Sequence, residues 1–232
     1  MVVAESLPAP VVERHGDFFI VRDDLITGGT KVRALSQLLT SGDEFAYAAP
    51  AAGYAQVALA VAAARCRAKA TIFVAQRKTL HPHTQEAQRS GARIIQVPVG
   101  YMSVVRARAR DYCSANGAQL LPFGFDTPAF VDILVSVAQG LNLDPVEVWS
   151  VAGSGVLTRA LQRAWSRAAV YAVRIGAKPK VGRAIIYEAP ERFEQVAKYP
   201  PPFPSCSNYD GKAWQFIKAH AKPGALFWNV AA

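Results

Sequence analysis

The chain has 232 residues and a formal net charge of +9, and 51% of its residues are hydrophobic, which argues against a globally disordered protein. No apolar run reaches the roughly 18 to 20 residues that a membrane-spanning helix needs, and residues 1–10 lack the basic start and apolar centre of a secretion signal. We therefore expect a cytosolic protein that makes no contact with a membrane. Three cysteines at wide, irregular spacing argue against a disulfide framework and against a zinc site.

The positive charge is concentrated in two stretches. Seven basic residues and no acidic residue occur from Arg159 to Arg183, and ten basic residues stand against Glu86 alone from Arg65 to Arg110. Such stretches are often solvated surfaces with acidic partners elsewhere, but clustered Lys and Arg also attract phosphate backbones. Both interpretations stay open, and the second makes a nucleic acid a candidate partner.

Strand and helix patterns alternate along the chain. A short apolar strand at 18–21 leads into a turn and then a helix at 31–39, whose apolar residues recur at helical spacing. The pattern continues in chain order with a strand at 44–48, an alanine-rich helix ending near 65, a strand at 70–75, a helix at 84–90, a strand at 93–97, a helix at 104–116, a strand at 119–122, a helix at 128–140, a strand at 147–151, a helix at 157–167, a strand at 169–175, a proline-rich loop at 199–208, a helix at 213–219 and a strand at 225–230. This alternation predicts an α/β fold in which a parallel sheet is flanked by helices.

Lys31 follows a glycine turn, Gly28-Gly29, at the expected start of a helix. The positive end of the helix dipole disfavours protonation of an amine there, which suits a lysine that forms a Schiff base. A surface lysine is the commoner case at such a position, so the position alone decides nothing.

Residues 150–157 (Ser-Val-Ala-Gly-Ser-Gly-Val-Leu) connect a strand with a helix. Small residues let backbone N–H groups approach a phosphate at a helix N-terminus, and Ser154 adds a hydroxyl. An ordinary tight turn has the same composition. The spacing does not match a Walker loop, because no Lys-Ser or Lys-Thr follows, and a dinucleotide fold is disfavoured because the loop comes late in the chain.

Residues 208–214 (Asn-Tyr-Asp-Gly-Lys-Ala-Trp) precede the last expected helix and strand. By themselves they indicate a helix N-terminus, with Asp210 and Gly211 as turn residues.

Together the three stretches resemble the fold-type II pyridoxal-phosphate (PLP) enzymes of the tryptophan-synthase-β-like superfamily, most closely the 1-aminocyclopropane-1-carboxylate (ACC) deaminase and D-cysteine desulfhydrase branch. The matching segments are residues 21–25 (Val-Arg-Asp-Asp-Leu) and 29–35 (Gly-Thr-Lys-Val-Arg-Ala-Leu), and residues 53–74 look like the family's Gly-Asn-His-Ala-Gln helix and the strand after it. The resemblance implies two lobes. The larger, cofactor-binding lobe comprises 1–45 and 118–232, and 46–117 form a smaller inserted α/β lobe.

The resemblance also implies PLP as the cofactor, bound by Lys31 as a Schiff base. The implied cofactor-binding residues are Lys31, Tyr54, Ala152, Gly153, Ser154, Gly155, Val156 and Asn229. The loop residues Ala51, Ala52 and Gly53 are expected to bind the substrate carboxylate, and the catalytic candidates are Lys31, Tyr54 and Tyr209. No metal is expected.

The chain departs from the family pattern at two places. Residues 51–54 (Ala-Ala-Gly-Tyr) lack the family's asparagine and the serine that acts in the deaminase, so Tyr54 is the candidate to stand in the asparagine's place. The C-terminus lacks the family's Thr-Gly-Gly, which leaves Asn229 as the candidate partner of the pyridine nitrogen.

Three functions follow from this resemblance. The first is a PLP-dependent lyase, deaminase or decarboxylase that acts at the α-carbon of a small amino acid. The second is an enzyme that tailors an amino-acid group attached to a nucleobase in DNA, motivated by the basic stretch Arg159–Arg183, the short segment before Tyr209 and the missing serine. The third is a PLP-fold protein without turnover. A homodimer is expected by analogy with the family.

Overall fold

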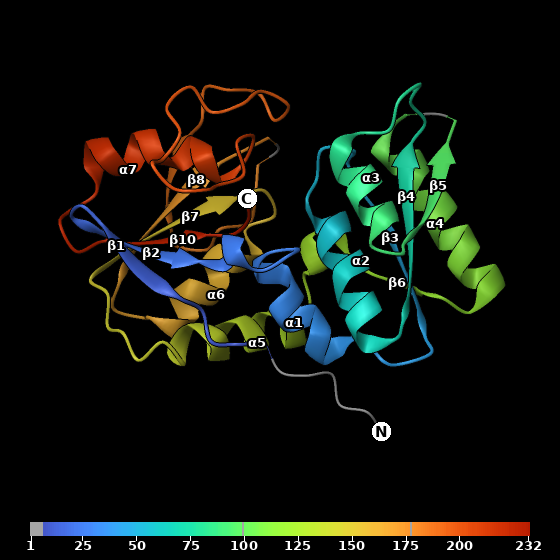
Figure 1. The fold of residues 1–232 in the computed structure, drawn as a ribbon, viewed down its shortest axis with the longest axis horizontal. Helices are drawn as coiled ribbons and strands as arrows, with labels where there is room; N and C mark the ends of the chain where they lie inside the picture. Colours follow the sequence, from blue (N-terminus) through green and yellow to red (C-terminus); the bar gives the residue numbers. More distant parts are fainter. Residues whose placement is uncertain (1–6, 99, 177) are drawn as a thin grey trace. The chain divides into compact units, whose positions relative to one another are not determined.

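The computed structural model describes residues 7–98, 100–176 and 178–232, which form two compact units (Figure 1). The large unit contains residues 7–33 and 126–232, and the small unit contains residues 34–125. The lobe boundaries expected from the sequence stay a prediction.

The large unit is built on a sheet with the strand order β1-β2-β10-β7-β8-β9. Its strands are β1 (Val12–His15), β2 (Phe18–Arg22), β7 (Glu147–Ala152), β8 (Ala169–Arg174), β9 (Ile185–Glu188) and β10 (Leu226–Asn229). Its helices are α5 (Pro128–Gln139), α6 (Val156–Ala164) and α7 (Trp214–His220), with the short 3-10 helices η1 (Asp23–Leu25) and η3 (Asp210–Ala213). All neighbouring strands are parallel except the antiparallel pair β1 and β2. In Figure 1, α7 lies on one face of this sheet, and α5 and α6 lie on the other.

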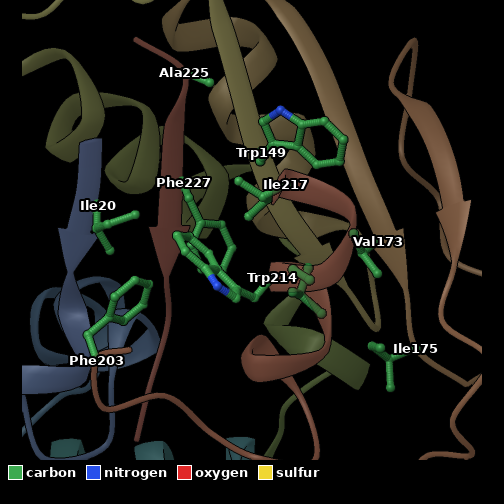
Figure 2. Packing of buried hydrophobic residues seen from close by; sticks show 11 residues of the cluster. Ile20, Trp149, Val173, Ile175, Phe203, Trp214, Ile217, Ala225 and Phe227 are labelled. Atoms are coloured by element: carbon green, nitrogen blue, oxygen red, sulfur yellow. The ribbon is translucent and has the colours of Figure 1, made fainter. Parts of the chain in front are cut away.

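The central strand β7 shows why this sheet is covered on both faces. Every residue of β7 is buried, as expected for a strand between two layers of helices. Trp149 packs in an apolar cluster with Trp214 and Ile217 of α7, which Figure 2 shows from close by. On the opposite face, the Ser150 hydroxyl forms a 2.9 Å hydrogen bond with that of Thr158 in α6. Alternate residues of β7 therefore face different helices.

The small unit has a fully parallel sheet with the strand order β5-β4-β3-β6. Its strands are β3 (Glu44–Ala48), β4 (Lys69–Ala75), β5 (Arg93–Val97) and β6 (Gln119–Leu120). Its helices are α2 (Ala55–Cys66), α3 (Pro82–Arg89) and α4 (Met102–Asn116), followed by the 3-10 helix η2 (Phe123–Phe125). Helices α2 and α3 cover one face and α4 covers the other (Figure 1). Helix α1 (Thr30–Leu38) crosses the division between the two units.

Two strands, β1 and β9, are absent from the elements that the sequence predicts. β1 contains Glu13, Arg14 and His15, so it lacks an apolar strand pattern, and it forms through a hairpin whose turn holds Gly16 at φ +61°. β9 is an edge strand that leaves Ile185 55% exposed. Both strands depend on pairing with a neighbour rather than on burial of their own side chains. No helix in the described part of the chain is long and apolar enough to cross a membrane.

Candidate functional site

Lys31 is the second residue of α1 and follows two glycines in the left-handed region, as the sequence predicts for a turn before a helix. A Cβ on Gly29 would lie 2.3 Å from the carbonyl oxygen of Val230, so the turn is packed directly on the chain that leaves β10. The N–H of Thr30 donates to the same carbonyl at 3.0 Å. These contacts join the start of α1 to the C-terminal segment.

A buried carboxyl group, Asp210, lies close enough to Lys31 to affect its charge. Lys31 is half-buried, and desolvation lowers the pKa of its amine while the charge of Asp210 opposes this effect. Burial raises the pKa of Asp210 to about 8, although hydrogen bonds from Val230 and Ala231 and the charge of Lys31 act in the opposite direction. The two groups therefore form a buried acid–base pair at the end of β10.

The two oxygens of Asp210 have different surroundings. Oδ2 accepts a hydrogen bond from the N–H of Ala231 at 3.2 Å, whereas Oδ1 has no hydrogen-bond partner among the described residues. A buried oxygen without a partner is unfavourable, so Oδ1 is a candidate to share a hydrogen bond with a group that the chain itself does not supply. By themselves the residues indicated Asp210 only as a turn residue, whereas the family resemblance made residues 209–212 the late tyrosine-acid-glycine-lysine motif near the substrate.

The loop between β7 and α6 is a tight connection from a strand to a helix, as its small residues predict. Gly155 has φ +84°, and a Cβ there would lie 2.0 Å from the carbonyl oxygen of Lys180, so only glycine fits. The N–H groups of Ser154 and Gly155 have no acceptor within the described residues, and the Ser154 hydroxyl lies 3.5 Å from the N–H of Val156. Free N–H groups at the start of the nine-residue helix α6 form a suitable site for an anion.

Tyr209 closes one side of this loop. Its hydroxyl accepts a 2.8 Å hydrogen bond from the N–H of Gly153 and lies 3.4 Å from the carbonyl oxygen of Val151. Burial raises the pKa of Tyr209. The structure thus brings together two stretches whose bonded residues, Gly153 and Tyr209, are 56 positions apart in the sequence. The N–H of Gly153 is already bonded, so the free donors of the loop are those of Ser154 and Gly155. The flanking side chains of Ala152 and Val156 are buried and pack inside the large unit.

Asn229 is fully buried and its amide is held by protein groups. Its Nδ2 donates to Asp24 Oδ1 and to the carbonyl oxygen of Pro204, both at 2.8 Å, and its Oδ1 accepts from Ser205 at 2.8 Å. These bonds join β10 to the segment after β2 and to the proline-rich loop. Contact between Asn229 and a cofactor stays a prediction, and the second lone pair of Oδ1 is the part of the amide without a partner in the described chain.

In the small unit, the loop at 51–54 is organised from inside by Gln56. The Gln56 amide donates to the carbonyl oxygens of Ala51 at 2.7 Å and Gly53 at 2.9 Å, and His83 Nδ1 lies 3.0 Å from that of Ala52. The N–H groups of Ala51 and Ala52 have no acceptor in the described chain. The loop therefore turns carbonyl groups inward and leaves the N–H donors of Ala51 and Ala52 free before the N-terminus of α2.

Tyr54 lies at the same end of α2. Its hydroxyl donates to Glu86 Oε1 at 3.4 Å, and its ring packs edge-on against His83 with centroids 5.1 Å apart. Its roles in cofactor binding and catalysis stay predictions, as do the substrate-binding roles of Ala51, Ala52 and Gly53.

Many cations of the basic stretch Arg159–Arg183 are bound within the protein. Arg159 pairs with Asp126, Arg163 with Asp132 and Arg174 with Glu188. Arg183 donates to the carbonyl oxygens of Ser166 and Ala168 just after α6. The first interpretation, a surface with acidic partners elsewhere, therefore describes Arg159, Arg163 and Arg174, and polyanion binding stays a prediction that rests on the other cations of the stretch.

Comparison with solved structures finds the same fold in several enzymes. An ACC deaminase homologue matches with a TM-score of 0.83 at 14% sequence identity, covering 98% of this chain and 91% of that chain. Isoform 2 of threonine deaminase from Solanum lycopersicum, in its processed form, matches with a TM-score of 0.70 at 12% identity, covering 93% and 74%. O-acetyl serine sulfhydrylase isoform 3 from Entamoeba histolytica matches with a TM-score of 0.72 at 13% identity, covering 99% and 88%.

These likenesses confirm the α/β fold that the sequence and its family resemblance predict. No protein-family model matches the chain, and the comparison with curated proteins finds no match.

Proposed function

We propose that this chain is a PLP-dependent enzyme that acts at the α-carbon of an amino acid, with Lys31 as the residue that holds the cofactor. The observation that carries the proposal is the convergence of Lys31, Asp210 and the free N–H groups of residues 154–155 in the large unit. Strands β2, β7 and β10 are parallel neighbours. Lys31 follows the carboxyl end of β2, the loop at 153–155 follows that of β7, and Ala231, whose N–H donates to Asp210, follows that of β10. Ligands of open α/β sheets bind at this edge.

The residues present match the three parts of PLP. The amine of Lys31 would hold the aldehyde carbon, and its lowered pKa favours the neutral, nucleophilic form. The unpartnered Oδ1 of Asp210 would hold the ring nitrogen, because a carboxyl group with a pKa of about 8 can share a proton with a pyridine. The N–H groups of Ser154 and Gly155 would hold the phosphate.

PLP supplies an electron-withdrawing ring that allows a bond at the α-carbon of an amino acid to break. The protein supplies the proton transfers and the orientation of the substrate. Lys31 is the group that would move a proton at the α-carbon, because desolvation keeps its amine easy to deprotonate. The free N–H groups of Ala51 and Ala52 would bind the substrate carboxylate and so orient the bonds at the α-carbon.

The contacts of the two tyrosines support different roles. The Tyr54 hydroxyl donates to Glu86 at 3.4 Å, a contact that would orient the phenol for the proposed proton transfer. Tyr209 is bonded to backbone groups of residues 151 and 153, which supports a role in positioning the loop for the cofactor phosphate.

The proposal is tested by locating the cofactor chemically. Full-length protein is incubated with PLP, reduced with borohydride and digested, and the modified lysine is identified by mass spectrometry. We expect the label on Lys31, together with a visible absorbance band that Lys31→Ala abolishes and that Lys178→Ala, at an exposed lysine of the same unit, leaves unchanged. No band in the wild type, or a label on another lysine, contradicts the proposal.

The same proposal includes two further points, that the chain turns over an amino acid and that it forms a homodimer. Release of ammonia or carbon dioxide from a panel of small amino acids distinguishes an enzyme from a PLP-binding protein without turnover. A homodimer, implied by the family resemblance, is tested by analytical ultracentrifugation of the full chain.

A further inference from the structure

A cavity of about 380 Å³ lies in the large unit at the amino end of β7 and β10, away from the edge where Lys31 and the loop at 153–155 lie. It is lined by Phe19, residues 143–147 and residues 222–226. Trp149 and Ala225 lie at this end of the sheet in Figure 2. Its volume falls in the range of roughly 300–1,000 Å³ that is typical of sites for small molecules. Nothing in the proposed function uses it.

A buried carboxylate, Glu147, is one of the polar groups that line the cavity. Glu147 is only 4% exposed. Its Oε1 accepts hydrogen bonds from Trp149 Nε1 at 2.7 Å and from the backbone N–H of Lys222 at 3.1 Å. Its Oε2 has no hydrogen-bond or ion-pair partner among the described residues, yet it is not enclosed by protein. One oxygen is therefore fixed by the fold, and the other is open to a ligand.

The second oxygen favours a cationic ligand group. A buried carboxylate that has lost part of its hydration is stabilised by a charged donor more than by a neutral one. The cavity lining contains two carboxylates, Glu147 and Asp144, and one ammonium group, Lys222, so its formal charge is −2 + 1 = −1 in a chain of formal charge +9. The local sign is thus opposite to that of the whole protein.

The remaining lining favours an apolar ligand body. Phe19, Leu143 and Val146 are 40%, 39% and 79% exposed, which leaves large apolar side chains uncovered at the cavity. An aliphatic group placed there would remove this surface from water, a gain of roughly 25 cal/mol for each Å² buried.

We propose that this cavity binds a small organic ammonium ion with an aliphatic body. The ammonium group donates to Glu147 Oε2, and the aliphatic group packs against Phe19 and Val146. Two sources share this chemistry: an apolar amino acid and the amine that lacks its carboxylate. Lys222 is exposed and has no ion pair in the described chain, so it would pair with the carboxylate of the amino acid.

Trp149 provides a reporter that is independent of Lys31, because its indole N–H donates to Glu147 itself. The full chain, purified without added cofactor and labelled with ¹⁵N, is titrated with 3-methylbutylammonium chloride while the indole signals of its four tryptophans are followed by NMR. Trp149→Phe assigns the signal. We expect a saturable shift of the Trp149 signal, and no comparable shift with 3-methylbutanol, which has the same body without the charge.

The matched variant is Glu147→Gln, whose amide oxygen can still accept from Trp149 and Lys222. We expect the dissociation constant for 3-methylbutylammonium to rise about tenfold or more, which corresponds to about 1.4 kcal/mol. Unchanged signals from the other three tryptophans show that the variant is folded. If Glu147→Gln does not fold, the proposal is still tested by comparing the binding of 3-methylbutylammonium and 3-methylbutanol to the wild type.

L-leucine distinguishes the two sources of the ammonium group. Binding of leucine that is tighter than that of the amine, and that weakens in Lys222→Gln, identifies an amino acid as the ligand; weaker binding of leucine identifies the amine. The proposal is overturned by a Trp149 signal that does not shift, by 3-methylbutanol binding as well as the ammonium ion, or by Glu147→Gln binding it unchanged. These outcomes do not depend on whether Lys31 binds PLP.

Discussion

Replacing Asp210 with asparagine tests the buried acid–base pair through its effect on stability. The pKa of Asp210 is raised from 3.8 to about 8 in the folded protein, so between these values the folded chain holds a proton that the unfolded chain has released. The stability of the wild type should therefore fall as pH rises through this range. The slope is about 1.36 kcal/mol per pH unit for one proton, which amounts to roughly 2 to 3 kcal/mol between about pH 5 and pH 7.

Asparagine resembles the protonated carboxyl group and can still accept from the N–H of Ala231, but it does not titrate. Urea unfolding of the cofactor-free full chain at three pH values between about pH 5 and pH 7 should thus show the wild type losing roughly 2 to 3 kcal/mol relative to Asp210→Asn. Asp17→Asn, at an exposed aspartate of the same unit, is the control and should follow the wild type.

Lys31 requires a second comparison, because its lowered pKa affects stability in the opposite direction as pH rises. Lys31→Met removes the charge that lowers the pKa of Asp210, so Asp210 should stay protonated to a higher pH in that variant. The slope of stability against pH should therefore differ between Lys31→Met and the double variant with Asp210→Asn up to a higher pH than it does between the wild type and Asp210→Asn. Parallel stability curves for the wild type and Asp210→Asn between about pH 5 and pH 7 would refute the assignment of a protonated, buried Asp210.

Three other perturbations have defined outcomes. Gly155→Ala should reduce PLP affinity and lower the free energy of unfolding by more than about 2 kcal/mol, because the new Cβ would meet the Lys180 carbonyl oxygen. The control is Gly224→Ala, at a glycine with the same φ of +84° but open space around it. Urea unfolding should show this control losing only about 1 kcal/mol. Tyr209→Phe removes the acceptor of the Gly153 N–H, so it should lower the free energy of unfolding by about 1–3 kcal/mol and weaken PLP binding measured by absorbance. If the variant binds PLP as tightly as the wild type does, Tyr209 does not position the loop. Activity on a free amino acid should change little as salt rises from about 50 to 200 mM, and a steep fall would favour a DNA-borne substrate.

The local features of the large unit are determined by short segments of sequence. The glycines at 28–29 specify a left-handed turn before α1, so Lys31 could be placed at a helix start without knowledge of the fold. Gly153 and Gly155 likewise predict a tight loop between β7 and α6, and the apolar runs predict the buried strands around it. These signals are local because backbone conformation and side-chain periodicity depend on neighbouring residues.

What only the tertiary structure decided is which of these segments meet and which of their polar groups remain free. The family resemblance placed Asp210 in a motif near the substrate, but the sequence did not indicate that its carboxyl group would be fully buried, that Tyr209 would take the N–H of Gly153, or that the amide of Asn229 would be held by Asp24 and the proline-rich loop. It also did not show that arginines of the stretch 159–183 would pair with Asp126, Asp132 and Glu188. Parallel strands bring the ends of distant segments to one edge of a sheet, and burial there sets the pKa and the open hydrogen bonds of each group, so these properties exist only once the chain has folded.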